Sequence, residues 1–246
     1  SDRDWSSDVC SSDLSIPELA HQLIDIALAE DLGDGDVTSE ATIPEAQTVT
    51  GRMVAKQDGV IAGMEIASLI FMKVDPLISF EPLVDEGGQV QKGDIVARFS
   101  GPGRSLLIGE RLALNFLQRM SGIATLTSRF MQEMAGTRAK ILDTRKTAPG
   151  MRYFDKLAVK LGGGTNHRIG LYDMVLIKEN HVAAAGGITK AVSRVREYDT
   201  KKRPIEVEIT NLDEFKEALA LKPDRIMLDN MSLADMRSAV DRKSVV

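Results

Sequence analysis

The segment IEVEITNLDEFKEALALKPDRIMLDN, residues 205–230, decides the fold. It begins and ends with short runs rich in Ile, Val and Leu, and a helical stretch at 212–221 separates them. Two similar runs precede it, AKILDT at 139–144 and MVLIKE at 174–179. Strands that alternate with helices pair in parallel, in a barrel or an open doubly wound sheet. The sequence therefore predicts an α/β fold for the C-terminal half of the chain.

The N-terminal part of the chain follows a different pattern. Its expected elements are, in chain order, a helix at 15–33, strands around a turn at 48–63, a short amphipathic helix at 64–74 and several short strands at 78–101. We therefore predict a small α+β domain over residues 15–106. A long helix over 107–133 opens a second domain, residues 107–246. The helices expected in that domain, besides 212–221, lie at 151–161, at 186–198 and from 232 onward.

The first fourteen residues, SDRDWSSDVCSSDL, differ from the rest of the chain. They hold the only Trp, the only Cys and little that could pack, and their wording resembles a translated sequencing adapter. We expect residues 1–14 to be a foreign or disordered tail.

Composition narrows the class of protein. The net charge of −5 argues against a general nucleic-acid binder, no apolar run has transmembrane length, and no signal peptide is visible. The single cysteine, Cys10, excludes an internal disulfide. We therefore expect a cytoplasmic protein with neither nucleic acid nor a membrane as its partner.

Charged side chains stand at the ends of the predicted strands. Residues 143–146 (DTRK) close the first strand, residues 178–181 (KENH) close the second, Glu208 closes the third and Asp229 the fourth. In parallel α/β folds the carboxyl ends of the strands line the active site. The sequence therefore predicts a single site built from these strand ends.

The candidate site is strongly cationic, with two acids in it. Its members are Arg145, Lys146, His167, Arg168, Lys178, Glu208 and Asp229. Cations held close together raise one another's energy unless a polyanion is present. Arginine matches carboxylates bidentately, lysine acts as a point charge on phosphate, and the acids can hold sugar hydroxyls or Mg²⁺ that carries pyrophosphate. The set suits a phosphorylated and carboxylated substrate.

Each part of this set also has another interpretation. Arg145 and Lys146 could form a solvated turn, and His167 could be a structural histidine. Lys178 could form a Schiff base, as in barrel aldolases, but the arginines are more than that role needs. GGGTNHR follows a helix and lacks the spacing of a P-loop or a Rossmann fingerprint. VDEGGQVQKGDIVARFSG resembles the turn of a biotinyl or lipoyl carrier domain, yet the modifiable lysine is absent.

Longer motifs resemble those of one family. They are ERLALNFLQRMSGIAT, DTRKTAPGMR, KLAVKLGGGTNHRIGLYDMVLIKENH, EVEITNLDEF and IMLDNM. From about Ser15 to Val240 the chain is similar to quinolinate phosphoribosyltransferase, a type II phosphoribosyltransferase also called nicotinate-nucleotide pyrophosphorylase (carboxylating). A sister family of molybdenum transport operons shares the TRKT stretch, whereas GGGTNHR and KENH resemble the quinolinate family.

The resemblance implies an N-terminal sandwich domain and a C-terminal six-stranded α/β barrel. It also implies a homodimer or a hexamer of dimers, in which the N-terminal domain of one subunit covers the barrel mouth of its partner. The implied reaction converts quinolinate and phosphoribosyl pyrophosphate, with Mg²⁺, into nicotinate mononucleotide, pyrophosphate and CO2, a step of de novo NAD synthesis. The alternatives are another enzyme of the same fold, either the molybdenum-operon relative or a nicotinate-type phosphoribosyltransferase, and an inactive fragment that still binds dicarboxylates.

The resemblance further implies how quinolinate is held. Arg145, His167 and Arg168 receive its carboxylates. Arg111, in ERLALN, reaches the site from the neighbouring subunit. The dicarboxylate would thus meet cations from two subunits.

The remaining residues receive catalytic roles from the resemblance. Lys146 and Lys178 meet phosphoribosyl pyrophosphate, and Lys178 also lies near quinolinate. Glu208 and Asp229 hold the ribose hydroxyls and Mg²⁺ and stabilise a ribosyl cation as pyrophosphate leaves. Fixed charges placed where charge develops are the main contribution that such a site makes.

The family also continues beyond LDNMSLADMRSAV, which ends at Val240. By resemblance, the continuation supplies the last two barrel strands and a Ser-Gly-Gly turn that binds the 5-phosphate. We therefore expect a C-terminally incomplete barrel domain with four of its six strands. Unpaired strand edges promote aggregation, so we expect the chain as it stands to be inactive and poorly folded.

Overall fold

Two units make up the computed structural model, which describes residues 16–243. The first unit extends to His167 and the second begins at Arg168. The tail predicted at residues 1–14 lies outside the described residues. The domain boundary predicted at 106/107 falls inside the first unit, because one continuous helix, α4 (Gly103–Glu133), runs across it. No helix within 16–243 is long and apolar enough to span a membrane.

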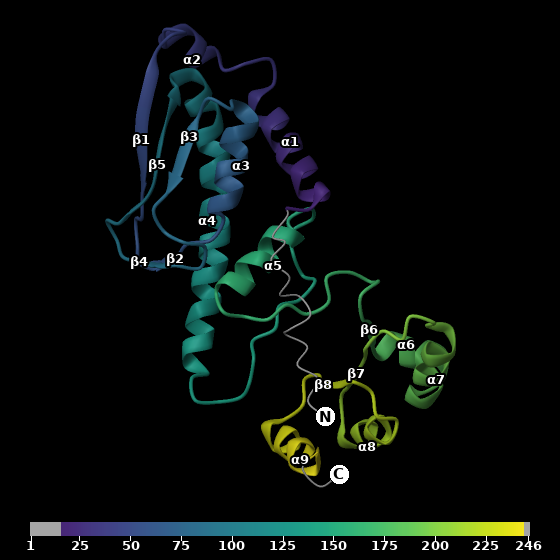
Figure 1. Ribbon diagram of the computed structural model, residues 1–246. Helices are drawn as coiled ribbons and strands as arrows, with labels where there is room; N and C mark the ends of the chain where they lie inside the picture. Colours follow the sequence, from purple (N-terminus) through teal and green to yellow (C-terminus); the bar gives the residue numbers. More distant parts are fainter. Residues whose placement is uncertain (1–15, 244–246) are drawn as a thin grey trace. The chain divides into compact units, whose positions relative to one another are not determined.

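The first unit combines antiparallel strands with helices. Its elements besides α4 are α1 (Glu18–Leu32), α2 (Val37–Thr42), β1 (Thr48–Val54), β2 (Gly59–Val60), α3 (Met64–Val74), β3 (Ser79–Pro82), β4 (Gln89–Val90), β5 (Ile95–Pro102) and α5 (Arg152–Leu161). The strands form two antiparallel sheets, β1-β5-β3 and β2-β4. Figure 1 shows β1, β5 and β3 side by side with α3 and α4 next to them. The α+β pattern predicted for this part is confirmed, although β1 and β2 pair with later strands and not with each other.

An aromatic stack joins the sheet to its helices. Phe71 of α3 stacks on Phe80 and Phe99 with ring centroids 5.5 and 5.6 Å away. Gly51 lies opposite Phe99 in the register of β1 and β5. A Cβ atom at Gly51 would stand 2.3 Å from the Phe99 ring, so only glycine leaves room for it.

The second unit contains the parallel βα pattern predicted from the sequence. Its elements are β6 (Val175–Ile177), α6 (Glu179–Ala185), α7 (Ile188–Tyr198), β7 (Ile205–Ile209), α8 (Leu212–Ala220), β8 (Arg225–Leu228) and α9 (Leu233–Lys243). The strands pair in parallel in the order β6-β7-β8. This part of the chain therefore has the α/β class that the sequence predicts.

One predicted strand does not form a ladder. Within 139–144, only Leu142 is paired, through a single parallel bridge to Thr165, and both residues belong to the first unit. The partner, Thr165, lies in the loop that follows α5. The four barrel strands expected from the sequence are therefore three strands and one bridge within the described residues. Helix α6, which directly follows Ile177, was not predicted either.

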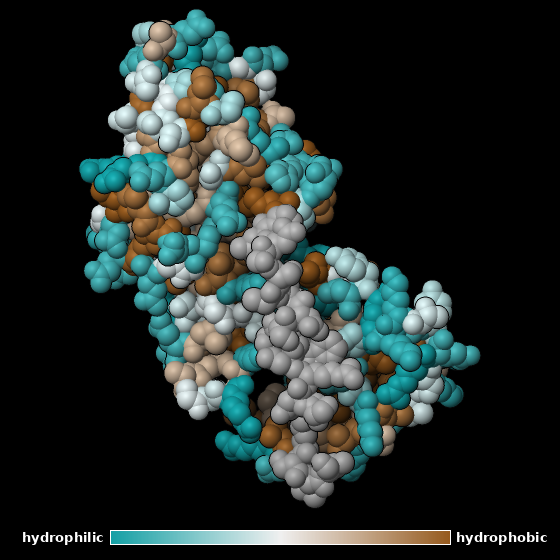
Figure 2. All heavy atoms as spheres, in the orientation of Figure 1, coloured by the Kyte–Doolittle hydropathy of each residue, from teal (hydrophilic) through white to brown (hydrophobic). Residues whose placement is uncertain are grey.

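Figure 2 shows how polar and apolar residues share one face of the molecule. Hydrophilic and hydrophobic residues are interspersed over this face. Among the exposed apolar side chains are Leu126 and Phe130 of α4, which are 55% and 54% exposed. These two residues lie one turn apart on a long helix and form a short apolar strip, which could contact another protein chain.

Asp199 orders the loop that leads into β7. Its carboxylate accepts hydrogen bonds from the main-chain N–H of Arg203 at 2.7 Å and of Lys201 at 3.2 Å, and it also pairs with the Arg203 guanidinium. The main-chain bond from Arg203 is the largest cause that lowers the Asp199 pKa below its ordinary value of 3.8. A carboxyl whose pKa is lowered by folding stabilises the protein above its unfolded pKa, and the stabilisation is lost as pH falls through the folded pKa.

We predict that Asp199→Asn lowers the free energy of unfolding at pH 7 and that the difference from the unaltered chain shrinks below about pH 4, the ordinary range of an Asp carboxyl. Urea unfolding at several pH values measures this. If Asp199→Asn lowers the free energy of unfolding by the same amount at pH 7 and at pH 3, the assignment is contradicted. The effect of the substitution would then not come from the loss of the Asp199 charge.

Candidate active site

Strand β7 divides the parallel sheet into an apolar face and a polar face. Ile205, Val207 and Ile209 are buried in a core that also contains residues of α7 and α8. Side chains alternate along a strand, so Glu206 and Glu208 point to the opposite face. Glu206 is only 4% exposed, and it lies 3.9 Å from the Arg225 guanidinium of β8. The polar face therefore carries two acids from a single strand.

The parallel register adds two predicted site residues to this polar face. Leu176 of β6 pairs with Glu206, and Met227 of β8 pairs with Glu208. Lys178 and Asp229 lie two residues further along these two strands, at their carboxyl ends. The Asp229 N–H still bonds the Ile209 carbonyl at 2.9 Å, so the strand direction continues as far as Asp229. Lys178, Glu208 and Asp229 therefore share one face of the sheet, as the sequence predicts.

Lys178 and Glu208 form an ion pair on this face. Lys178 Nζ lies 3.8 Å from Glu208 Oε2, and the two side chains are 48% and 15% exposed. The Lys178 N–H donates to Nδ1 of His181 at 2.9 Å, which fixes the first turn of α6. A Schiff-base lysine is activated by desolvation or by a neighbouring cation. Lys178 is half exposed and faces a carboxylate, which favours a role in binding.

The carboxylates of this face suit a Mg²⁺ ion that is already bound to the phosphates of a substrate. Within 16–243, the structure contains no group of three or more His, Cys, Asp or Glu that could hold a metal. Glu208 and Asp229 offer two carboxylates. Mg²⁺ is usually bound through one or two carboxylates while substrate phosphates and water supply its other oxygens. The donor set therefore fits Mg²⁺ carried by a phosphorylated substrate.

Arg168 lies in another part of the second unit. It lines a cavity of about 490 Å³ beside β6, together with apolar residues of α6 and α7 and the side chains of His181 and Arg194. Its guanidinium donates to the Met174 carbonyl at 3.4 Å. Arg168 therefore lies beside the edge strand β6, at the polar rim of an apolar cavity.

In the first unit, a buried network connects the segments that carry Arg145 and His167. Asp143 Oδ1 accepts from Lys156 Nζ at 2.5 Å and from the His167 N–H at 2.7 Å. Lys156 Nζ also donates to the His167 carbonyl at 3.1 Å. With its amide nitrogen toward these acceptors, Asn166 donates to Asp143 Oδ2 at 2.8 Å and to the Lys156 carbonyl at 2.9 Å. Lys156 was not predicted as a site residue; its one signal in the sequence is a charge on the inward face of a helix.

Three predicted cations of the first unit lie at or near its surface. Lys146 and Arg111 are exposed, the first in the loop after Asp143 and the second on α4. Arg145 is half-buried, and its Nε has no hydrogen-bond partner among the described residues. A buried donor without an acceptor is costly, so Arg145 is suited to receive an anionic ligand.

The glycines of GGGTNHR serve helix packing. A Cβ atom at Gly162 would lie 2.4 Å from the carbonyl oxygen of Ala124 in α4, and one at Gly164 would lie 2.7 Å from Val159. Gly163 has φ +88°, a left-handed conformation that favours glycine. The three residues therefore turn the chain tightly from α5 toward Asn166 and His167. The conclusion that this motif is not a phosphate loop agrees with that geometry.

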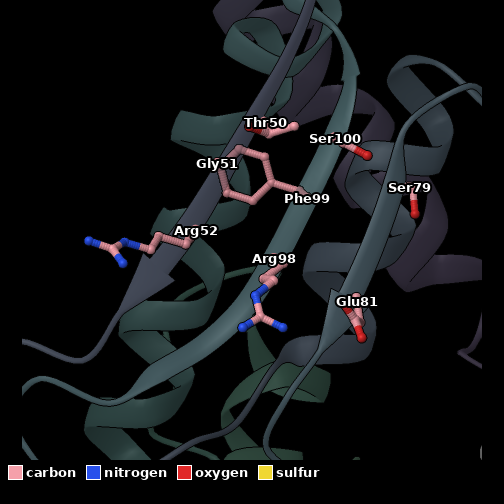
Figure 3. Close-up of a pocket in the computed structure, with 8 residues that line it drawn as sticks. All are labelled: Thr50, Gly51, Arg52, Ser79, Glu81, Arg98, Phe99 and Ser100. Carbon is pink, nitrogen blue, oxygen red and sulfur yellow. The ribbon is translucent and has the colours of Figure 1, made fainter.

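A separate polar groove crosses the outer face of the sheet β1-β5-β3 (Figure 3). Arg52 and Glu81 both lie opposite Arg98 in the strand register. The groove has a volume of about 490 Å³ and includes none of the predicted site residues. We place the candidate site at the charged strand ends, because they combine cations and carboxylates in the way a charged substrate requires.

These features define an α/β protein that carries a lysine and two carboxylates, Lys178, Glu208 and Asp229, on one face of its parallel sheet. Two family models match nearly the whole described chain: "Quinolinate phosphoribosyl transferase, N-terminal domain" over residues 36–121 and "Quinolinate phosphoribosyl transferase, C-terminal domain" over residues 123–245. The chain belongs to the quinolinate phosphoribosyltransferase family. The family predicted from the motifs is thus confirmed.

Relatives and solved structures agree with this assignment. A protein of Oryza sativa subsp. japonica named "Nicotinate-nucleotide pyrophosphorylase [carboxylating], chloroplastic" is 48% identical over 219 residues, which cover 85% of this chain and 58% of the relative. A relative in Synechocystis sp. is 46% identical and covers 87% of this chain and 72% of its own length. The crystal structure of NadC from Streptococcus pyogenes has a TM-score of 0.89 at 38% identity, covering 94% of this chain and 81% of that one.

The chain spans 58% of the length of the rice relative and 62% of an Arabidopsis thaliana relative. The rice and Arabidopsis thaliana relatives are named chloroplastic, and a relative in Nicotiana glauca is named mitochondrial. The cytoplasmic location expected from the sequence therefore stays a prediction.

We predict that Gly162→Ala lowers the free energy of unfolding by about 1–3 kcal/mol, because the new methyl group overlaps main-chain atoms of α4. Gly122→Ala is the matched control. It lies on α4 with nothing within 4 Å of its added Cβ, and it should stabilise the chain by about 0.5–1 kcal/mol through helix propensity. Thermal or urea unfolding of the two variants measures both effects, and an equal response would show that Gly162 has room for a side chain.

Proposed function

We propose that this chain belongs to an enzyme that converts quinolinate and phosphoribosyl pyrophosphate into nicotinate mononucleotide, pyrophosphate and CO2, in de novo NAD synthesis. The observation that carries the proposal is the shared polar face of the parallel sheet, with Lys178, Glu208 and Asp229 at the strand ends. Its support is the family of the chain and the relatives named for this reaction.

The cations of the site match a dicarboxylate. In the proposal, Arg145, His167 and Arg168 receive the two carboxylates of quinolinate. The Arg145 Nε, which lacks a partner among the described residues, is the kind of donor that such a substrate satisfies. Binding both carboxylates would also orient the ring nitrogen toward the sugar.

The sheet face matches the sugar phosphate. Lys146 and Lys178 would neutralise its phosphate groups, and Glu208 and Asp229 would accept hydrogen bonds from the ribose hydroxyls. The two carboxylates would also hold the Mg²⁺ ion, which supplies positive charge to the pyrophosphate when it is bound. Lys178 stands 3.8 Å from Glu208, so one side chain can contact the phosphate while the other contacts the ribose.

The chemistry needs placed charges and no covalent intermediate. Pyrophosphate leaves C1 of the ribose, and the positive charge that develops there is stabilised by Glu208 and Asp229. The quinolinate ring nitrogen forms the new bond to C1 and becomes cationic. The carboxylate on the neighbouring ring carbon then leaves as CO2, the cationic ring accepts the electron pair, and that carbon takes up a proton.

Assembly is part of the proposal. A homodimer or a hexamer of dimers would let Arg111 serve the site of a neighbouring subunit. Arg111 is exposed on α4, the helix that also exposes Leu126 and Phe130. A long helix that presents an arginine and apolar side chains to its surroundings is suited to pack against a second copy.

We predict that the enzyme uses quinolinate and rejects nicotinate, because a missing carboxylate leaves a cation of the substrate site without its partner, a loss that discriminates by about 10⁴-fold in kcat/KM. The assay measures CO2 release and nucleotide formation. Since the chain spans 58% of the rice relative, two proteins are tested: the chain as it stands, and residues 15–240 joined to the C-terminal segment of the Synechocystis relative. Comparable turnover of nicotinate and quinolinate would contradict the proposed substrate. Quinolinate binding without CO2 release in both proteins would favour a binding role.

We predict that Arg111 acts across subunits. Arg111→Ala and Lys146→Ala should each be inactive in the extended protein, and mixing the two should restore about a quarter of the activity, since statistical exchange gives hybrid dimers with one intact site. Mass spectrometry confirms subunit exchange, and mixtures of wild-type protein with either variant serve as controls. Exchange without recovery would place Arg111 in its own subunit's site or outside any site.

A further inference from the structure

We propose that Asp143 and Lys156 are a positioning pair that sets Arg145 and His167 for carboxylate binding. This inference rests on the proposed function, and it adds two residues that would not themselves touch the substrate. It starts from the buried network of the first unit, in which one ion pair holds two segments that are distant in sequence.

The pair closes a ring of three contacts around His167. Asp143 binds the His167 N–H, Lys156 binds the His167 carbonyl, and Asp143 and Lys156 bind each other. Both main-chain groups of His167 are therefore fixed by a pair that comes from a different segment. The parallel bridge from Leu142, which directly precedes Asp143, to Thr165 also holds the two segments together. The position of the histidine is thus set relative to residue 143.

The same pair sets the start of the loop that carries Arg145. Asp143 is two residues before it, and Thr144 Oγ1 accepts the Lys146 N–H at 3.0 Å, which closes a turn directly after Asp143. The turn leaves the Arg145 Nε buried with no partner among the described residues. A donor held away from water and from protein acceptors is preorganised for a ligand.

Burial distinguishes this pair from the surface ion pairs. The side chains of Lys156 and Asp143 are 4% and 6% exposed. Burying two charges costs desolvation energy that their attraction only partly returns, so such a pair is a weak source of stability and often serves to define one conformation. In this chain the conformation that it defines is the relative position of residues 145 and 167.

Helix α5 also provides a matched control. Asp155, the neighbour of Lys156, is 8% exposed and receives a bidentate ion pair from Arg119 at 2.7 and 2.8 Å. This pair connects α5 to α4, away from the ion pair of Asp143 and Lys156 in its bonding partners. Its loss should lower stability without moving the proposed carboxylate site.

The test uses the extended protein, residues 15–240 joined to the C-terminal segment of the Synechocystis relative, and compares Lys156→Met with Asp155→Asn. Calorimetry measures the Kd of quinolinate and of phosphoribosyl pyrophosphate, and thermal unfolding measures the Tm. We expect both variants to lower the Tm. Only Lys156→Met should weaken quinolinate binding, by about tenfold to a hundredfold as for a displaced binding group, with phosphoribosyl pyrophosphate affected less.

Asn166→Ala provides a second, milder variant in case Lys156→Met fails to fold. It removes the contact with Asp143 Oδ2 and leaves the ion pair in place. We expect weaker quinolinate binding in the same direction and faster hydrogen exchange at the His167 amide, whose acceptor is Asp143.

Three outcomes would overturn the inference. Equal quinolinate affinity in Lys156→Met and Asp155→Asn would make the pair merely structural. Unchanged affinity and exchange in Asn166→Ala would do the same. No quinolinate binding by the extended protein without substitutions would contradict the proposed function first, and the positioning role with it. The extended protein is therefore measured before any variant.

Discussion

The alternation of side chains along β7 is the constraint on which the candidate site depends. The strand must bury Ile205, Val207 and Ile209 against its helices, because that apolar core stabilises the second unit. A parallel strand has only two faces, so the same requirement directs Glu206 and Glu208 away from the helices. Hydrophobic burial on one side thus sets the position of the carboxylates on the other.

Register then extends this effect from one strand to three. Parallel pairing places residues of β6 and β8 at fixed steps along β7, and the strand ends of all three fall on one edge. Lys178 and Asp229 share the face of Glu208 for this reason. A slip of one residue in either neighbouring strand would turn its charged end toward the helices. The register that buries the apolar core is therefore also the register that the site needs.

In the first unit, close packing and buried polar contacts position the predicted site residues. Gly162 lets the chain pass against the carbonyl oxygen of Ala124, and the ion pair of Asp143 and Lys156 then captures His167. Rigid elements do not carry Arg145 and His167, which lie in loops. Their positions depend on polar contacts that are shielded from water, where hydrogen bonds and ion pairs are stronger and more specific than at the surface.

The sequence by itself determined the α/β class, the parallel βα pattern, the family and the identity of the charged strand ends. Periodicity of Ile, Val and Leu and the motif wording are local properties, so they can be read without coordinates. It did not predict helix α6, the lack of a ladder at 139–144 or the role of Lys156. The missing ladder and the role of Lys156 depend on contacts between separate segments: an isolated bridge from Leu142 to Thr165 and a lysine buried against Asp143. The start of α6 involves a local contact, in which the Lys178 N–H donates to His181 Nδ1. Only the tertiary structure decides such pairings. The type of a residue determines which kind of partner it needs, but the fold determines which residue lies close enough to be that partner.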